Sequence, residues 1–153
     1  MKLRKLDYSF YDENAHLEQT LDGDGRNKTR GYGIVVIELA DGMTWGIPLH
    51  SNLQNDACFV THKELVDGQE RKVGLNYSKA LLLAKPEYIS TAKFGIPDAQ
   101  KDAIARSERK IKKDFEKYVR AYVRFVRTGN ARQLNSRDYR FTTLSNYKKE
   151  LGL

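Results

Sequence analysis

The segment from residue 32 to residue 49 constrains the fold more than any other part of the sequence. It holds two apolar, β-branched runs, Tyr32–Leu39 and Met43–Leu49, separated by Ala40-Asp41-Gly42. Such runs are typical of strands, and an Asp-Gly pair tolerates the positive φ angles that a tight turn needs. The spacing therefore predicts an antiparallel hairpin. Pro48 lies late in its second strand and predicts an edge or a bulge, because proline has no N–H to donate.

The segments around this hairpin are short and punctuated by turns. We expect a strand at Lys2–Leu6, a short helix at Glu13–Leu21 and another short strand at Cys58–Leu65. The closing FTTLSNYKKEL predicts a short strand and then a short helix. Everything before Pro97 is expected to be mainly β.

From Pro97 onward the pattern changes to that of a helix. Asp98 is a plausible N-cap and Gly129 a plausible C-terminal stop, with no proline or glycine between them. Apolar residues recur there at three- and four-residue steps, which predicts one long amphipathic helix: Ile104, Ile111, Phe115, Tyr118, Val119, Tyr122 and Val126. The fold class expected for residues 1–153 is one α+β domain, a compact antiparallel β-barrel or half-barrel core with a long basic helix and shorter flanking helices.

Several classes of protein are excluded by composition. At 153 residues one domain is expected, and no apolar run approaches the ~18–20 residues of a membrane helix. The basic N-terminus lacks the apolar core of a secretory signal. Cys58 is the only cysteine, so an intramolecular disulfide and a cysteine-rich zinc site are impossible. The three histidines lack metal-binding spacing, so we expect no metal or other cofactor, and a cytoplasmic location.

The basic charge is concentrated in the last third of the chain. Residues 1–100 hold 12 Lys and Arg against 14 Asp and Glu, whereas residues 101–153 hold 15 against 6. A basic surface on one segment indicates a polyanion partner, most commonly nucleic acid. The alternative is a solvated helix face without a ligand. Six cations share one broad side of the expected helix: Lys110, Lys113, Lys117, Arg120, Arg124 and Arg127.

The hairpin also brings together residues that could break RNA. The polar loop at residues 22–31 precedes a strand rather than a helix, so it is not a helix-capped phosphate loop. Lys28 and Arg30 approach the first strand, and His50 and Ser51 leave the second at the same end of the hairpin. RNA cleavage without metal needs a base for the 2′-OH, an acid for the leaving 5′-oxygen and cations for the phosphorane. The alternatives are a surface loop and a turn capped by His50 and Ser51.

Aromatic residues near these cations could stack on unpaired RNA bases. Tyr11, Tyr32 and Tyr118 are the candidates for this role. The alternative for Tyr118 and Tyr122 is a place on the apolar stripe of the helix, which we prefer for Tyr122.

Several blocks, in this order and spacing, resemble the toxins of type III toxin–antitoxin systems, the ToxN/AbiQ group with its CptN and TenpN relatives. The blocks are GIVVIEL, WGIPLHS, VGLNYSKALLL, EKYVRAY and FTTLSNYKKELG, which together span most of the chain. The CptN or TenpN branch fits best. No single block is specific; their order is.

The resemblance implies a function and a set of site residues. It implies a barrel like that of the small plasmid-toxin endoribonucleases and metal-independent cleavage of single-stranded RNA to 2′,3′-cyclic phosphate ends. It also implies inhibition by a repetitive antitoxin RNA that the toxin processes into pseudoknots, in a closed RNA–protein assembly, with growth arrest or abortive infection as the outcome. Ser51 matches the family's active-site serine, and Tyr11 and Tyr118 match its aromatics. His50 stands where relatives often have threonine.

Two features of the resemblance and the choice of function stay open. The family's catalytic lysine falls at Lys28, Thr29 or Arg30, and the register does not choose among them. The family's tryptophan after the serine has no counterpart in SNLQND. A non-catalytic RNA- or DNA-binding small-barrel module explains the charge equally well, and a protein-interaction domain with a solvated basic helix is the third possibility.

Overall fold

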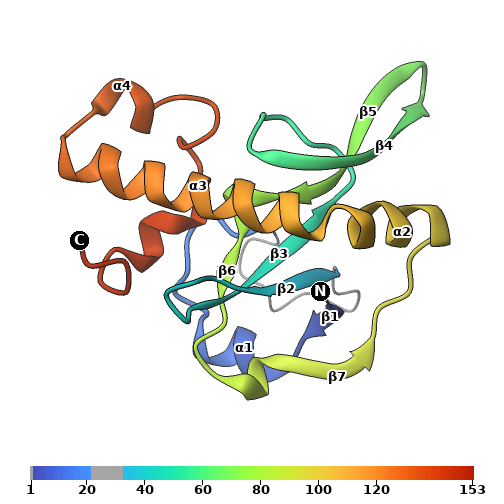
Figure 1. Ribbon diagram of the computed structural model, residues 1–153, viewed down its shortest axis with the longest axis horizontal. Coiled ribbons are helices and arrows are strands. Elements are labelled where there is room, and N and C mark those ends of the chain that lie inside the picture. The colour runs from blue at the N-terminus through green and yellow to red at the C-terminus, as the bar shows by residue number, and fades with distance from the viewer. Residues whose placement is uncertain (1, 22–32) are drawn as a thin grey trace.

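A computed structural model describes residues 2–21 and 33–153, and in them the chain has an α+β fold (Figure 1). The described strands are β1 (Lys2–Leu6), β2 (Ile34–Glu38), β3 (Thr44–His50), β4 (Cys58–Val66), β5 (Gln69–Asn76), β6 (Leu81–Leu82) and β7 (Ile89–Lys93). The helices are α1 (Tyr8–Glu13), α2 (Asp98–Arg106), α3 (Glu108–Arg127) and α4 (Ala131–Leu134). Short 3₁₀ turns are η1 (Tyr77–Lys79), η2 (Pro86–Tyr88) and η3 (Thr143–Tyr147).

The strands of the described residues form one antiparallel seven-stranded sheet. Its order is β4-β5-β3-β2-β1-β7, and β6 adds to β3 beside this path. Because β4 and β7 stand at the two ends of the path, the sheet is open. The α+β class is thus confirmed, whereas the closed barrel is not.

The hairpin predicted from residues 32–49 is confirmed. β2 and β3 pair from Ile34 opposite Pro48 to Glu38 opposite Thr44. Gly42 turns the chain with a φ of 88°, and its N–H donates to the carbonyl oxygen of Leu39 at 2.9 Å. The hairpin is therefore built by the turn chemistry that the sequence shows.

The edge or bulge predicted at Pro48 is wrong, because Pro48 is buried in a central strand. On one side of β3 the partner changes along its length, from β6 beside Trp45 and Gly46 to β5 beside Leu49 and His50. The Leu49 N–H donates toward β2, to the Gly33 carbonyl, so the neighbouring Pro48 nitrogen faces the other side. The missing N–H thus falls where one partner has ended and the next has not begun.

β4 and β5 form a second hairpin, which Figure 1 shows extending away from the rest of the molecule. Its turn is Asp67-Gly68, with φ angles of 49° and 76°. The pairing shifts by one residue between Val60 and His62, which is a β-bulge. Gly74 lies opposite Val60 at this bulge and opposite His50 in β3. This glycine is therefore paired with a strand on each side.

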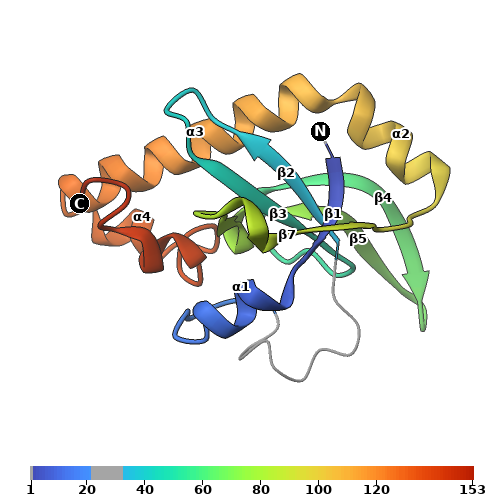
Figure 2. The ribbon, with the colours of Figure 1, turned by 90° about the horizontal axis from the view of Figure 1, so that it is seen from below.

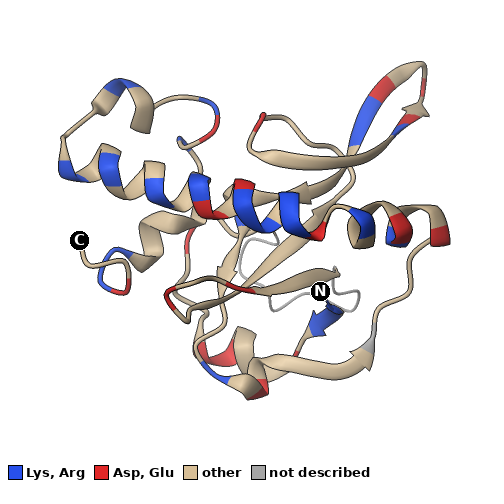
Figure 3. Cartoon of the chain, in the orientation of Figure 1, with Lys and Arg blue, Asp and Glu red and all other residues tan. Residues whose placement is uncertain are grey.

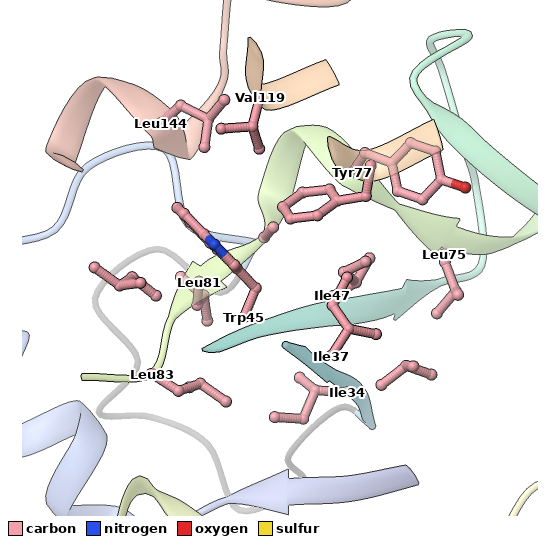
Figure 4. Close-up of a cluster of buried hydrophobic side chains, with 14 of the residues drawn as sticks. Ile34, Ile37, Trp45, Ile47, Leu75, Tyr77, Leu81, Leu83, Val119 and Leu144 are labelled. Carbon is pink, nitrogen blue, oxygen red and sulfur yellow. The ribbon is translucent and has the colours of Figure 1, made fainter. Parts of the chain in front are cut away.

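The core lies between the sheet and α3. Figure 2 shows α2 and α3 along one face of the sheet and α1 on the opposite side. Trp45 is fully buried, with its ring edge-on to Phe115 at 5.6 Å and to Tyr147 at 5.4 Å. Around it Figure 4 shows apolar side chains from β2, β3, β5, α3 and η3 converging. Burial of this apolar stripe is what fixes α3 on the sheet.

The long helix is interrupted, contrary to the prediction of one helix from Asp98 to Gly129. Ser107 separates α2 from α3, and its N–H donates to the Ile104 carbonyl. The bend lets Gln100 of α2 donate to Thr61 beside the β4 bulge at 3.1 Å, while α3 follows the core. Gly129, with a φ of 63°, ends the helical segment as predicted. No helix of the described segments is long and apolar enough to cross a membrane.

Two short elements also differ from the prediction. α1 covers Tyr8–Glu13 rather than Glu13–Leu21, because Asp7 caps it by accepting from the Ser9 N–H at 2.9 Å. Near the C-terminus the chain forms the 3₁₀ turn η3 and no strand, because Thr142 caps this turn through the Leu144 N–H.

Candidate functional site

The candidate site lies where β3 and β5 end side by side. His50 of β3 pairs with Gly74 of β5, and Asn76 lies two residues after Gly74 on the same strand. The side chains of His50 and Asn76 are therefore diagonal neighbours on one face of the sheet. Asn76 is buried and its side-chain nitrogen lies 3.1 Å from His50 Nδ1. η1 follows directly and adds Ser78 and Lys79. We call His50, Ser51, Asn76, Ser78 and Lys79 the His50 cluster.

The hydrogen bonds around Asn76 fix the protonation of His50. The Ser78 backbone N–H, which can only donate, reaches Asn76 Oδ1 at 3.1 Å, and the Ser78 hydroxyl donates to the same oxygen at 2.6 Å. The other end of the amide, Nδ2, must therefore face His50 and donate to Nδ1. His50 Nδ1 accepts, so the neutral ring carries its proton on Nε2. At neutral pH His50 can donate a hydrogen bond to a ligand through Nε2–H.

The surroundings of His50 favour this neutral ring. Burial of the half-buried ring lowers the pKa of His50 below its usual 6.5, and the nearby positive charge of Lys79 lowers it further. Protonation at Nδ1 would also place two donors against each other and break the bond to Asn76. The ring is thus held as a neutral donor rather than as an imidazolium.

We expect this to make the stability of the fold depend on pH. A histidine with a lowered folded-state pKa contributes stability above its unfolded pKa and loses it as pH falls through the folded value. The free energy of urea unfolding should therefore drop more between about pH 7.5 and about pH 5.5 in the wild-type protein than in His50→Asn. An equal drop in both proteins would contradict the assignment.

Lys79 joins the cluster to two distant segments. Its Nζ donates to the carbonyl oxygen of Gln19 at 2.8 Å and to that of Phe141 at 2.7 Å. Burial lowers the pKa of this ammonium, whose charge reaches His50. An ammonium has three N–H donors. Two are used by these carbonyls, so the third is the one that could reach an anionic ligand.

Ser51 is exposed at the bend that follows β3. The loop behind it is anchored at three points. Leu53 N–H donates to the Lys72 carbonyl, the Asn55 amide donates to the Ser78 hydroxyl, and the Asp56 N–H donates to the Asp138 carboxylate, all at 2.9–3.0 Å. Ser51 is therefore an exposed residue next to His50, and the loop that follows it is anchored by hydrogen bonds.

The remaining catalytic candidates fall outside the described residues. Lys28, Arg30 and the aromatic candidate Tyr32 belong to residues 22–32. The next residue, Gly33, accepts a hydrogen bond from Leu49 N–H at 2.9 Å, just before His50. The outer ends of β2 and β3 thus lie side by side at Gly33 and Leu49, and the approach of Lys28 and Arg30 to Ser51 stays a prediction.

Tyr118 is placed in the core, which corrects its assignment as a stacking surface for RNA. It is 6% exposed, and its ring stacks on Tyr139 with centroids 4.6 Å apart. Its hydroxyl donates to the Asp138 carbonyl at 2.6 Å and lies within hydrogen-bond distance of Thr142 Oγ1, at 3.0 Å. The apolar stripe takes Tyr118 as well as Tyr122, because both lie on the buried face of α3. Tyr11 lies on α1, half-buried and edge-on to Phe10.

The cations predicted to bind RNA lie on α3, along which Figure 3 shows that Lys and Arg recur. Lys113, Lys117, Arg120 and Arg124 are all exposed. Arg120 pairs with Glu116, and the Arg124 guanidinium lies over the Phe125 ring at 5.2 Å. Lys113 and Lys117 have no ion-pair partner within the described chain. We call these four residues the basic face of α3.

A hollow beside this face lies at the far end of the hairpin from His50. It has a volume of about 460 Å³, and Arg120, Arg124 and Arg127 line it together with Asp41 and Glu150. Asp41 belongs to the β2–β3 turn, whereas His50 ends β3. Two carboxylates among its three guanidinium groups leave the hollow less positive than the open face.

Sequence reasoning missed the residues that organise the cluster. Asn76 and Lys79 stood only within a block used for the family resemblance, with no role assigned. The sequence Asn76-Tyr77-Ser78 could have indicated the role of Asn76. An asparagine side chain often accepts a hydrogen bond from the backbone N–H two residues later, which is called an Asx turn. What this pattern could not show was the contact with His50, which is 26 residues away along the chain.

The His50 cluster offers hydrogen-bond donors to an anionic or hydroxylated ligand: the His50 Nε2–H, the Ser51 hydroxyl and the Lys79 ammonium. Hydrogen-bond donors of these kinds suit a phosphodiester. In the described part of the chain, no three His, Cys, Asp or Glu side chains lie together as ligands for a metal ion. No protein-family model, curated protein or solved structure matches this chain.

Proposed function

We propose that this protein is a metal-independent endoribonuclease, the toxin of a type III toxin–antitoxin system. The observation that carries the proposal is the His50 cluster, in which a buried amide holds a neutral histidine beside an exposed serine and a half-buried lysine. The order of sequence blocks that resembles the ToxN/AbiQ group also supports it. Under this proposal, the open seven-stranded sheet corresponds to the family's barrel core.

The proposed reaction is an internal transesterification. The 2′-hydroxyl gives its proton to a water molecule as its oxygen attacks the adjoining phosphorus. The bond to the 5′-oxygen breaks, this oxygen takes a proton from water, and the products are a 2′,3′-cyclic phosphate and a 5′-hydroxyl. Negative charge grows on the non-bridging oxygens in the transition state. His50 Nε2–H and Lys79 would donate to these oxygens, and fixed donors aimed at developing charge are strongly stabilising.

Ser51 would contact the attacking 2′-hydroxyl and hold it in line. Positioning of this kind removes entropy from the barrier, and it needs an anchored backbone. The three hydrogen bonds behind the Ser51 loop supply that anchor. Lys28 and Arg30 remain candidates from the sequence for a further cation.

The partner proposed for the basic face of α3 is RNA: the cellular substrate and a repetitive antitoxin RNA folded into pseudoknots. Such an antitoxin would hold the toxin in a closed, RNA-bridged assembly in the cytoplasm. Release of the toxin from this assembly would cause growth arrest or abortive infection. Short tandem repeats followed by a terminator are expected in the DNA just upstream of the gene. Upstream DNA without repeats would argue against this class of toxin.

A non-catalytic RNA- or DNA-binding module is the second candidate, because the basic face of α3 would serve it equally well. Incubation of the purified protein with single-stranded RNA in excess EDTA separates the two. The proposal predicts shortened RNA. Tight binding with intact RNA would favour the module, and no salt-dependent binding at all would favour a protein-interaction domain.

Two lysines of the basic face provide a test of the RNA contact. Each phosphate contact to a single strand contributes about 0.7 to the slope of log K against log salt, so loss of two contacts should make the slope shallower by about 1.4. We expect this change for the double variant Lys113→Glu, Lys117→Glu, measured by fluorescence anisotropy with a short single-stranded RNA. Lys63→Glu on β4, which removes a salt bridge to Glu70, is the control. An unchanged slope in the double variant would remove these lysines from the interface.

A further inference from the structure

Phe141 is an exposed aromatic side chain next to the His50 cluster. It is 52% exposed, whereas its neighbours Thr142, Thr143 and Leu144 are buried. Its carbonyl oxygen accepts from Lys79 Nζ at 2.7 Å, the ammonium whose charge reaches His50. The backbone of Phe141 therefore lies next to the proposed phosphodiester site, and its exposed ring is not held by packing in the core.

The backbone that carries Phe141 is fixed on both sides. Before it, Arg140 N–H donates to the Ser136 carbonyl at 2.8 Å. After it, Thr142 Oγ1 is hydrogen-bonded with the buried Tyr118 hydroxyl, and Thr143 Oγ1 donates to the carbonyl oxygen of Ala80, with that of Ser78 3.3 Å away. A ring on such a frame loses little conformational entropy when a ligand binds it.

A cation shares the platform. The Arg140 guanidinium lies over the Phe141 ring with its carbon 5.1 Å from the centroid. Unpaired RNA bases stack on aromatic rings and on arginine guanidinium planes. A guanidinium that lies over an aromatic ring also places positive charge near the phosphates of the bound RNA. Phe141 and Arg140 are thus residues of the kinds that stack on bases. They adjoin the His50 cluster, because Lys79 of the cluster donates to the Phe141 carbonyl oxygen.

We propose that Phe141, supported by Arg140, stacks on an unpaired nucleobase of the RNA whose phosphate lies at the His50 cluster. This inference rests on the proposed function and names the subsite that would hold the substrate beside the bond to be broken. It supplies the stacking surface that Tyr118, buried in the core, cannot.

The test is a binding cycle between protein and RNA variants. The probes are a short, fluorescently labelled 2′-O-methyl oligonucleotide, which cannot be cleaved through its 2′-oxygen, and the same backbone with abasic residues in place of every nucleotide. Phe141→Leu keeps an apolar side chain without a ring. We expect it to bind the base-carrying oligonucleotide about 5- to 100-fold more weakly than wild type, and the abasic one equally well. Phe141→Trp should bind the base-carrying probe at least as tightly as wild type.

The control and the contrary outcomes are specific. Tyr8, an aromatic residue of α1 that is 77% exposed, gives Tyr8→Leu as the matched variant, which should bind both probes like wild type. Equal weakening of both probes by Phe141→Leu, or no weakening, would overturn base stacking even if the wild type cleaves RNA. Wild-type protein that neither binds the base-carrying probe nor cleaves RNA would overturn the proposed function itself, and this inference with it.

Discussion

Replacing Ser51 with alanine is expected to stop RNA cleavage while RNA binding persists. The variant removes one hydroxyl at an exposed bend, so the fold and the basic face of α3 stay as they are. Loss of one positioned hydrogen-bonding group in a phosphoryl or acyl transfer site costs about 10²- to 10³-fold in rate. We expect a loss of that size in cleavage of labelled single-stranded RNA, with an unchanged dissociation constant, and loss of growth arrest on expression.

Ser145→Ala is the matched control for this experiment. Ser145 is an exposed serine of η3 whose hydroxyl donates to the Thr142 carbonyl at 3.2 Å. It should cleave RNA and arrest growth like the wild-type protein. Undiminished cleavage by Ser51→Ala would remove Ser51 from the mechanism.

The second large effect is expected at Gly74, and it acts on the fold. A Cβ atom at this position would lie 1.9 Å from the carbonyl oxygen of Phe59 and 3.0 Å from the Thr61 nitrogen. Both are backbone atoms of the β4 bulge, so the strands must move apart. Severe overpacking of this kind costs about 3 kcal/mol or more, which lowers the melting temperature by about 6–12 °C in a domain of this size.

Gly95→Ala is the control for Gly74→Ala. Apart from its chain neighbours, no atom of the described residues lies within 4 Å of a Cβ built on Gly95, and thermal unfolding should be nearly unchanged. Because Gly74 pairs with His50, RNA cleavage by Gly74→Ala should fall even at temperatures where the variant is folded. A melting temperature equal to that of the wild type would show that β4 yields without cost.

Local chemistry in the sequence was sufficient for the β2–β3 hairpin and for the end of α3. Asp41-Gly42 and Gly129 each adopt the conformation that their residue types favour. The apolar stripe also located the buried face of α3, because helical periodicity is repeated over many residues. A prediction that depends on the residues of one turn, or on apolar residues at helical spacing over many residues, needs no knowledge of distant contacts.

Tertiary contacts decided the points that the sequence did not reveal. The bend at Ser107 serves a contact between Gln100 and Thr61, which are 39 residues apart. Pro48 is tolerated in a central strand only because its neighbour changes from β6 to β5. Neither pairing can be found from local propensity.

The candidate site follows the same division. His50 and Ser51 were identified because they leave a predicted strand of the hairpin. The sequence left open whether His50 acts as an acid or a base, and the hydrogen bond from Asn76 to its Nδ1 favours a neutral hydrogen-bond donor instead. Asn76 is oriented by a local turn, but only the pairing of β3 with β5 brings it to His50. Lys79 was missed because its contacts are with Gln19 and Phe141, which are distant in the sequence.

The nature of the RNA ends tests the central claim, that groups of this chain make the 2′-oxygen attack its own phosphodiester. The measurement is the ³¹P NMR spectrum of a short RNA after incubation with the wild-type protein in EDTA. We predict a 2′,3′-cyclic phosphate signal, and none when the attacking nucleotide is 2′-deoxy. Products with 5′-phosphate ends, or cleavage that continues without the 2′-hydroxyl, would contradict the account.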